Sequence, residues 1–389
     1  MEDEIERIRQ LAVTRYLNGE SAEAICTSLG KSQSWLYKWI NRYQSNSKCW
    51  NRSHSRRPNS QQSRTPSEIE EVVKLVRLNL YNRGLFCGAQ AIHWELEELC
   101  VKPLPSIRTI NRILNRHGLT RRRTGKYKAK GTAYPALPSF LPNQTHQLDL
   151  VGPCYLKGPI RFYGLNVIDT ATARCGLSPI HNKSAQSILN GLWAIWIRMG
   201  IPERVQIDNA MSFFGSFRHP RGMGPLIRLC LNNKVEPWFI PMAEPWRNGM
   251  IESFNHRYQN MFLAKQEMHS EAELIKHSLL FEQKHNSKYR YSKLGGKTPM
   301  KTLAESAIDL RFPKNDVAPE HPQKKPKDGK YHLVRLIRSD CRIDVFGEFF
   351  KVPPELIYEY VIATIDVKEQ KIKLFQENSQ VEEYDYKLR

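Results

Sequence analysis

The chain has 389 residues, with 59 Lys and Arg against 39 Asp and Glu, and a formal net charge of +20. This length fits roughly two to four domains, and the positive surplus predicts a polyanionic partner such as nucleic acid. The sequence holds no apolar run long enough to cross a bilayer, no secretory leader and no prenylation box, so we expect no membrane association. Its eight scattered cysteines form no Cys-x-x-Cys pair, which argues against a zinc finger and favours a reducing cytoplasm.

Residues 1–45 predict a helix-turn-helix unit. Apolar residues recur at helical spacing from Ile5 to Tyr16 and stop at the turn Asn18-Gly19. A short helix capped by Ser21 follows, and a third helix begins after Ser32. The third helix is expected to bury Trp35, Leu36, Trp39, Ile40 and Tyr43. Its outward side chains are suited to the major groove of DNA, and they are Gln33, Ser34, Lys38 and Arg42.

Two acid-poor basic stretches predict linkers that cross phosphate backbones. The first, residues 46–65, contains Arg56 and Arg57. The second, residues 121–139, contributes Arg121, Arg122, Arg123, Lys126 and Lys128. A solvated tail without a partner is the alternative interpretation of such stretches.

Residues 66–120 repeat the helical pattern. Ser67 and Glu70 fit a capping box, and a further helix is marked by Ile92, Leu96 and Leu99. The last helix begins after Ser106, turns Ile107, Ile110, Ile113 and Leu114 inward, and ends at Gly118. Its outward cations are Arg108, Arg112 and Arg116. We therefore expect a second DNA-binding helix-turn-helix module; a bundle used for packing or dimerisation is the alternative.

Residues 140–303 alternate strands with helices, which predicts an α/β core. Strands are expected at 146–151, 161–169, 175–180, 204–207 and 235–240, with a helix capped by Ser184 between the third and the fourth. Asp149 is placed at the end of the first strand, and Asp208 follows the fourth. A helix with Ile251, Phe254 and Tyr258 inward sets Glu252 in its first turn.

These three acids predict a metal site. Hard divalent cations prefer carboxylate oxygens, and a pair of Mg²⁺ ions can stabilise both the attacking and the leaving oxygen of a phosphodiester. Asp149, Asp208 and Glu252 are therefore the candidate catalytic and metal-binding residues. Asp169 and Glu244 are nearby alternatives, but an acid before a turn often only caps it, and Glu244 precedes Pro245 in a loop.

The same residues resemble the DDE transposases and retroviral integrases, most closely bacterial insertion-sequence transposases with an integrase-type core. Leu148-Asp149-Leu150 is similar to the first-aspartate strand of that family, Asp208-Asn209 to its second-aspartate motif, and the segment from Asn248 to Asn255 to its glutamate helix. The resemblance implies a ribonuclease-H-like core that uses two strand aspartates and a helix glutamate. It also implies two Mg²⁺ ions, with Mn²⁺ as a substitute.

The chain departs from the family at some positions. Ala210 stands where glycine is usual, and the interval from Asp208 to Glu252 is longer than usual, with the excess expected in the Gly-rich loop 215–224. Gln259 occupies the place of a basic residue that holds a DNA end. The resemblance then implies that this contact falls to His256, Arg257 or Lys265; His256 and Arg257 are otherwise ordinary surface residues.

After a Pro- and Lys-rich linker at 304–330, residues 331–389 alternate apolar and polar positions between close turns. This pattern predicts a small β-barrel, similar to the one in Mu transposase; it would contact DNA or a partner subunit, or only stabilise the chain. The predicted fold is therefore multidomain: N-terminal all-α helix-turn-helix modules, a central α/β ribonuclease-H-like core and a C-terminal small β-barrel.

The resulting functional expectation is a DNA transposase. Such an enzyme would bind the terminal inverted repeats of a mobile element, pair them as a homo-oligomer in a synaptic complex, cleave 3′ ends and join them to double-stranded target DNA. A prokaryotic cytoplasm, in association with the nucleoid, is the expected location. The alternative function is a transposase-derived DNA-binding regulator whose core no longer cuts.

Overall fold

The computed structural model describes residues 2–45, 48–53, 65–120, 134–156, 161–216 and 218–389. The chain forms two compact units, residues 1–64 and residues 65–389. The candidate DNA-binding residues of the two predicted linkers lie outside the described residues; they are Arg56, Arg57, Arg121, Arg122, Arg123, Lys126 and Lys128.

The first unit is the predicted three-helix module. Ser21 and Ser32 cap the second and third helices by accepting hydrogen bonds from the backbone N–H groups of Ala24 and Trp35. Trp39 lies in the core, whereas Tyr43, expected inward, is 41% exposed and packs edge-on against Trp50 at the helix end. The helices are α1 (Glu2–Leu17), α2 (Ala22–Leu29) and α3 (Gln33–Gln44).

The second unit begins with another three-helix module, formed by α4 (Ser67–Asn82), α5 (Ala89–Glu98) and α6 (Ile107–Arg116). The predicted capping box is wrong: Pro66 occupies the N-cap position without a side-chain cap. Glu70 is instead buried, where it pairs with Arg116 and lies 3.2 Å from His117 Nε2. A local motif could not reveal this partner across the module, because the two side chains meet only when α4 packs on α6.

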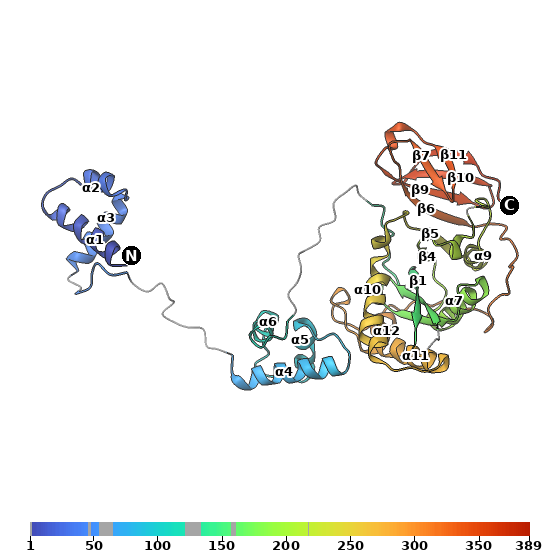
Figure 1. Cartoon of the computed structure of the whole chain (residues 1–389), viewed down its shortest axis with the longest axis horizontal. Helices are drawn as coiled ribbons and strands as arrows, with labels where there is room; N and C mark the ends of the chain where they lie inside the picture. The colour runs from blue at the N-terminus through green and yellow to red at the C-terminus, as the bar shows by residue number, and fades with distance from the viewer. Residues whose placement is uncertain (1, 46–47, 54–64, 121–133, 157–160, 217) are drawn as a thin grey trace. The chain divides into compact units, whose positions relative to one another are not determined.

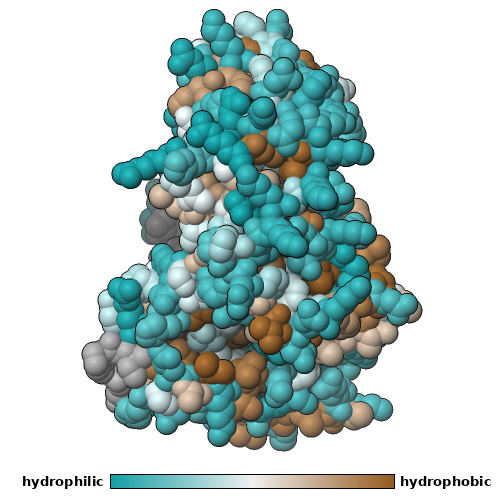
Figure 2. Space-filling view, turned by 90° about the vertical axis from the view of Figure 1, so that its right-hand side faces the viewer, coloured by the Kyte–Doolittle hydropathy of each residue, from teal (hydrophilic) through white to brown (hydrophobic). Residues whose placement is uncertain are grey.

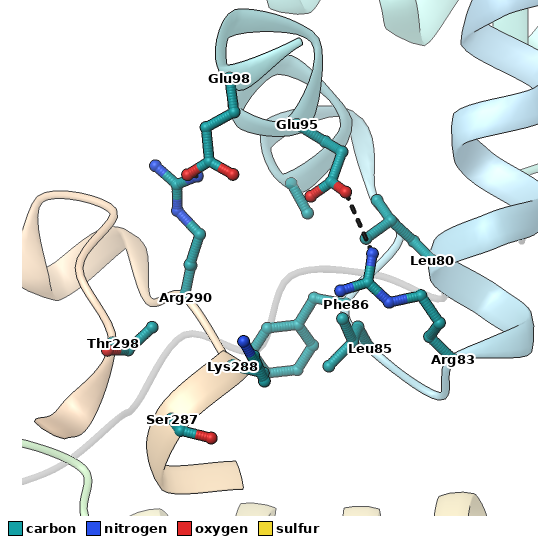
Figure 3. Close-up of a pocket in the computed structure, with 11 residues that line it drawn as sticks. Leu80, Arg83, Leu85, Phe86, Glu95, Glu98, Ser287, Lys288, Arg290 and Thr298 are labelled. Carbon is teal, nitrogen blue, oxygen red and sulfur yellow. Dashed lines mark hydrogen bonds and ion pairs between the residues drawn. The ribbon is translucent and has the colours of Figure 1, made fainter. Parts of the chain in front are cut away.

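This second module is joined to the rest of its unit at the end of α11 (Glu271–Lys288). Tyr289 Oη donates to the carbonyl oxygen of Gly84 at 2.5 Å, and Phe86 packs edge-on against Tyr289 and Tyr291. Figure 3 shows the adjoining pocket, which is lined by Arg290, just after α11, and by Glu98 at the end of α5. The Arg290 Nη1 to Glu98 Oε1 distance is 2.5 Å.

A nine-stranded sheet runs through the second unit in the order β11-β10-β9-β6-β5-β4-β1-β2-β3. The core strands are β1 (Thr145–Tyr155), β2 (Arg161–Asp169), β3 (Cys175–Ile180), β4 (Arg204–Ile207) and β5 (Glu236–Phe239). β1 is antiparallel to β2 and parallel to β4. Asp149 lies inside β1 and does not end it, since the strand continues to Tyr155.

Alternate residues of these strands face two different layers of helices, as the period of a β-strand requires. Leu148 and Leu165 belong to the apolar cluster that includes α7 (Ala185–Met199) and α9 (Pro225–Asn232). Ile168 belongs to the cluster that includes α10 (Gly249–Arg257) and α11. Figure 1 shows α10 on one side of the strands and α7 with α9 on the other. Shorter elements of the core include α8 (Met211–Phe214), a 3₁₀ turn η1 (Pro245–Asn248) and α12 (Pro299–Glu305).

The strand-rich C-terminal region is confirmed, and it continues the core sheet. β6 pairs in parallel with β5, and Phe346 stacks on Phe214 with ring centroids 4.5 Å apart, so one apolar core spans both regions. The strands of this region are β6 (Lys330–Leu336), β7 (Arg342–Val345), β8 (Glu348–Lys351), β9 (Tyr360–Asp366), β10 (Lys371–Gln376) and β11 (Ser379–Asp385). β7 and β8 form a separate hairpin.

The surface is mostly polar on the face drawn in Figure 2, where hydrophilic residues (teal) predominate and apolar residues (brown) gather mainly in the lower part. Among the helices that the structure describes, none combines the length and apolar character that crossing a bilayer would need.

Candidate active site

Two of the candidate acids lie side by side because of the strand register. β1 and β4 are parallel neighbours, and Gln147 is level with Gln206. Asp149 and Asp208 each lie two residues after one of these glutamines. Because side chains alternate along a strand, both aspartates face the same side of the sheet as the glutamines. Adjacent strands are about 4.8 Å apart. The sequence thus sets two carboxylates next to each other, Asp149 within β1 and Asp208 directly after the end of β4.

The glutamines hold the third acid over that same face. Gln147 Oε1 accepts from the backbone N–H of Ile251 at 3.0 Å, directly before Glu252. Gln206 Nε2 donates to the Arg247 carbonyl and to Asn248 Oδ1, both at 2.9 Å. The Gln147 side chain satisfies a backbone N–H that a helix start leaves unpaired, and Gln206 holds the turn just before the helix. They fix the beginning of α10 to β1 and β4, and with it the first turn that carries Glu252.

Asp149 is the most constrained of the three acids. Its Oδ2 accepts from Asn255 Nδ2 at 2.6 Å, and Asn255 Oδ1 in turn accepts from Asn166 Nδ2 at 2.8 Å. Burial raises the pKa of the Asp149 carboxyl above its ordinary value, and the charges of Asp208 and Glu252 raise it further. The electrostatic coupling means that both other acids lie close enough to act on Asp149.

Asp208 follows β4 and turns the chain into the next loop. Its Oδ1 accepts from the Ala210 backbone N–H at 3.0 Å. Burial raises the pKa of the Asp208 carboxyl, whereas the Ala210 hydrogen bond and the charge of Lys183 act in the opposite direction. Lys183 therefore adds a cation beside the acids, and sequence reasoning did not single it out.

The donor set fits divalent cations in its chemistry. Three carboxylates, two of them with raised pKa values, gather where a cation would relieve their repulsion. Their side chains do not form a closed cluster of three ligands: within the described ranges no group of three His, Cys, Asp or Glu side chains is compact enough to hold a metal. Metal binding by this trio therefore stays a proposal.

Both alternative acids have structural partners. Asp169 accepts from Thr172 Oγ1 at 2.5 Å and from the Ala171 N–H at 3.2 Å, so it caps the turn after β2. It is level with His146, three residues before Asp149 on β1, which puts it about 10 Å along the strand. Glu244 is paired with Arg247 at 2.8 Å. These contacts favour Asp149, Asp208 and Glu252 over the two alternatives as the candidate metal ligands.

The predicted DNA-binding residues on α3 have the expected setting. Gln33, Ser34 and Lys38 are exposed on the helix that follows the turn. Arg42 is half-buried, with its guanidinium carbon 4.7 Å from the ring centroid of Trp39. This face presents polar side chains from a packed helix, which a recognition helix requires.

On α6, Arg108 and Arg112 are exposed, whereas Arg116 is exposed but paired with Glu70. Near the acids, His256 is exposed, and its Nδ1 accepts from Asn260 Nδ2 at 3.1 Å, one turn further along the chain. Arg257 is half-buried, with its guanidinium 5.4 Å from the ring centroid of Phe86 and 5.7 Å from that of Tyr291. Arg257 is therefore engaged between α10 and the second module. Contact of any of these residues with DNA stays a prediction.

Comparison with known families finds one match in the first helical module and one in the α/β core. Residues 6–49 match a homeodomain-like domain, and residues 233–299 match the integrase core domain. The second match includes Glu252 and α10, but neither aspartate. Together these matches support the resemblance seen in the sequence: the first helical module is similar to a homeodomain-like domain, and the segment with the glutamate helix is similar to an integrase core domain.

Solved structures that resemble the chain include retroviral integrases. One is the catalytic core domain of HTLV-2 integrase in complex with magnesium, at 15% identity and a TM-score of 0.34, covering 43% of this chain and 99% of that one. Another is a chain of the simian T-cell lymphotropic virus intasome in complex with PP2A regulatory subunit B56 gamma, at 13% identity and a TM-score of 0.37, covering 75% and 88%.

Proposed function

We propose that the protein is a DNA transposase. It binds the terminal inverted repeats of its element, cleaves their 3′ ends and joins them to target DNA, acting as a homo-oligomer in a synaptic complex in the prokaryotic cytoplasm. The observation that carries this proposal is the convergence of Asp149, Asp208 and Glu252 on one face of the sheet, in a chain whose first domain is homeodomain-like.

Asp149, Asp208 and Glu252 are the residues that would hold two Mg²⁺ ions, or Mn²⁺ in their place. When bound, such ions stabilise the attacking and leaving oxygens of a phosphodiester. The side chains around the trio supply orientation. Asn255 fixes Oδ2 of Asp149, and Gln147 with Gln206 fixes the helix that carries Glu252. Holding the strand and the helix that carry the acids in place would reduce the reorganisation needed at the moment of reaction.

The DNA partner is supported by charge as well as by the helical domain. A net charge of +20 favours contact with phosphates along an extended duplex. Lys183, whose charge acts on Asp208, would stabilise a phosphate near the acids. The exposed residues of α3 and α6 would then supply contacts away from the cutting centre.

The test uses the full chain and a DNA fragment that carries a candidate element end. Asp149→Asn, Asp208→Asn and Glu252→Gln should each lower Mg²⁺-dependent nicking and joining at least about 100-fold, because several kcal/mol of charge stabilisation is lost. Affinity for the DNA end should remain. Glu271→Gln is the matched control, since this exposed acid on α11 pairs with surface His181, and its replacement should leave the rate unchanged.

Strand joining that survives in the Glu252→Gln protein would contradict the assignment of the trio. A wild-type protein that binds element ends tightly but never nicks them with Mg²⁺ or Mn²⁺ would instead support the regulator function.

A further inference from the structure

The C-terminal strand region, residues 330–389, reaches the loop that follows the second aspartate through Arg335. This side chain on β6 is only 5% exposed. Its Nη2 donates to Asn209 Oδ1 at 2.9 Å, and its Nε donates to the Asp344 carbonyl at 2.9 Å. Asn209 is the residue next to Asp208, so the guanidinium acts one residue away from a candidate metal ligand.

Asn209 is held from two sides. Its Nδ2 donates to the Ile240 carbonyl at 2.6 Å, just after β5, while Arg335 holds its Oδ1. The parallel pairing of β5 with β6 brings these two anchors together. The path of the chain where it leaves β4 at Asp208 is therefore determined by two strands, one of which belongs to the C-terminal region.

A second contact from this region reaches the start of the glutamate helix. Tyr360 Oη, at the beginning of β9, donates to Glu244 Oε1 at 2.8 Å and accepts from Arg247 Nη2 at 3.0 Å. Arg247 also pairs with Glu244 at 2.8 Å. Its guanidinium lies 4.0 Å from the ring centroid of Tyr134 and 5.3 Å from that of Tyr360. The turn η1, which leads directly into α10, is thus clamped by Tyr360.

We propose that the C-terminal strand region is part of the active site, with Arg335 and Tyr360 as positioning residues for the loop after Asp208 and for the helix of Glu252. This inference rests on the proposed function. It assigns the region a role in setting metal-ligand geometry, where the sequence left open a DNA contact, a subunit contact or simple stabilisation.

The chemistry of the contacts argues against stabilisation alone. Desolvating a guanidinium is costly, and apolar residues of similar volume often stabilise a protein as well or better. Burial lowers the pKa of Arg335 to about 10, so the side chain remains charged at neutral pH. A planar, charged donor with fixed geometry is suited to holding an amide in one place. Small errors in the placement of catalytic groups lower rates steeply.

The experiment compares the full-length wild type with Tyr360→Phe and Arg335→Lys. The first variant removes only a hydroxyl, and the second keeps the charge but loses the fork of donors. Tyr384→Phe is the matched control, because the Tyr384 hydroxyl donates to the Lys351 carbonyl within the same region. Mn²⁺ affinity is measured by calorimetry, and the Mg²⁺ concentration for half-maximal nicking is measured on a candidate DNA end.

Both positioning variants should bind Mn²⁺ about 10-fold more weakly, as loss of an outer-shell partner typically causes. They should need correspondingly more Mg²⁺ for nicking and recover their rate when Mg²⁺ is raised. Tyr384→Phe should match the wild type, and DNA affinity and melting temperature should be unchanged in Tyr360→Phe. A purely structural role would not produce rescue by the metal.

Wild-type metal affinity in Tyr360→Phe would overturn the assignment of Tyr360, even if Arg335→Lys failed to fold. Wild-type affinity in both variants would overturn the whole inference and leave the transposase function intact. A wild-type protein that neither binds Mn²⁺ nor nicks DNA would overturn the proposed function and the inference together.

Discussion

The two helical modules repeat one sequence pattern in different surroundings. In the first, α1–α3 close their own core around Trp39, and the family match is homeodomain-like. In the second, α4–α6 share their core with Tyr289 from the end of α11. The first module is a compact unit by itself, whereas the second belongs to the unit that carries the candidate active site.

The difference shows that a helix-turn-helix pattern specifies helix faces but not what those faces contact. In the second module, Phe86 lies beside Arg257, five residues after Glu252 on the same helix. Any DNA held by α4–α6 would therefore be held in a fixed position relative to the acids. DNA held by α1–α3 has no such constraint from the contacts within its unit.

The largest effect is expected from Trp39→Ala in the first module. Trp39 is only 4% exposed and lies beneath Arg9 and Arg42, at 4.1 and 4.7 Å from their guanidinium carbons. Losing this side chain costs about 3–5 kcal/mol, which is about all the stability that a module this small has. Calorimetry of the full chain should lose the transition of the first unit and keep that of the second unchanged. Affinity for the element end should fall to the non-specific level.

A shift of both transitions in the Trp39→Ala protein would break the comparison, because it would mean that the two units unfold as one.

The sequence predicts elements well where the information is local. The strands at 161–169, 175–180 and 204–207 are found with those bounds, and Ser106 and Ser184 cap their helices as expected. Each of these features depends on residues a few positions apart, where periodicity and capping chemistry are decisive.

Contacts between distant segments were missed. Nothing near Glu70 reveals that Arg116 will neutralise it, and nothing near Arg335 reveals that it will hold Asn209. In the sequence, Gln147 and Gln206 look like ordinary strand residues. Only the register of β1 with β4 shows that the two glutamines lie side by side. A polar residue among the apolar positions of a strand or helix was the available signal in these cases, since burying it requires a partner.

An intermediate effect is expected from Phe86→Ala in the second module. Phe86 fills the space between Tyr289, Tyr291 and Arg257, with the two tyrosine ring centroids at 5.0 and 5.4 Å. Its removal should cost about 2 kcal/mol and lower the melting temperature of the second unit by a few degrees. Because Arg257 loses a neighbour, nicking should slow by about 10-fold, a barrier change of ~1.4 kcal/mol. Leu78→Ala is the control, since Leu78 on α4 is 49% exposed.

A loss of stability in Phe86→Ala without any change in nicking would mean that the second module packs on the core but does not influence α10.

The smallest effect is expected from Arg112→Ala, which tests whether α6 contacts DNA. Arg112 is exposed on α6, whereas Arg116 is paired with Glu70, so Arg112→Ala tests DNA contact without disturbing the buried pair. If α6 reaches phosphates, the slope of log affinity against log salt should fall by about 1. Lys38→Ala on α3 should have a similar effect, and Lys301→Ala on exposed α12 serves as the control for net charge. An unchanged slope in Arg112→Ala, with a reduced slope in Lys38→Ala, would make α4–α6 a packing bundle that supports α10, and would leave DNA recognition to the first module.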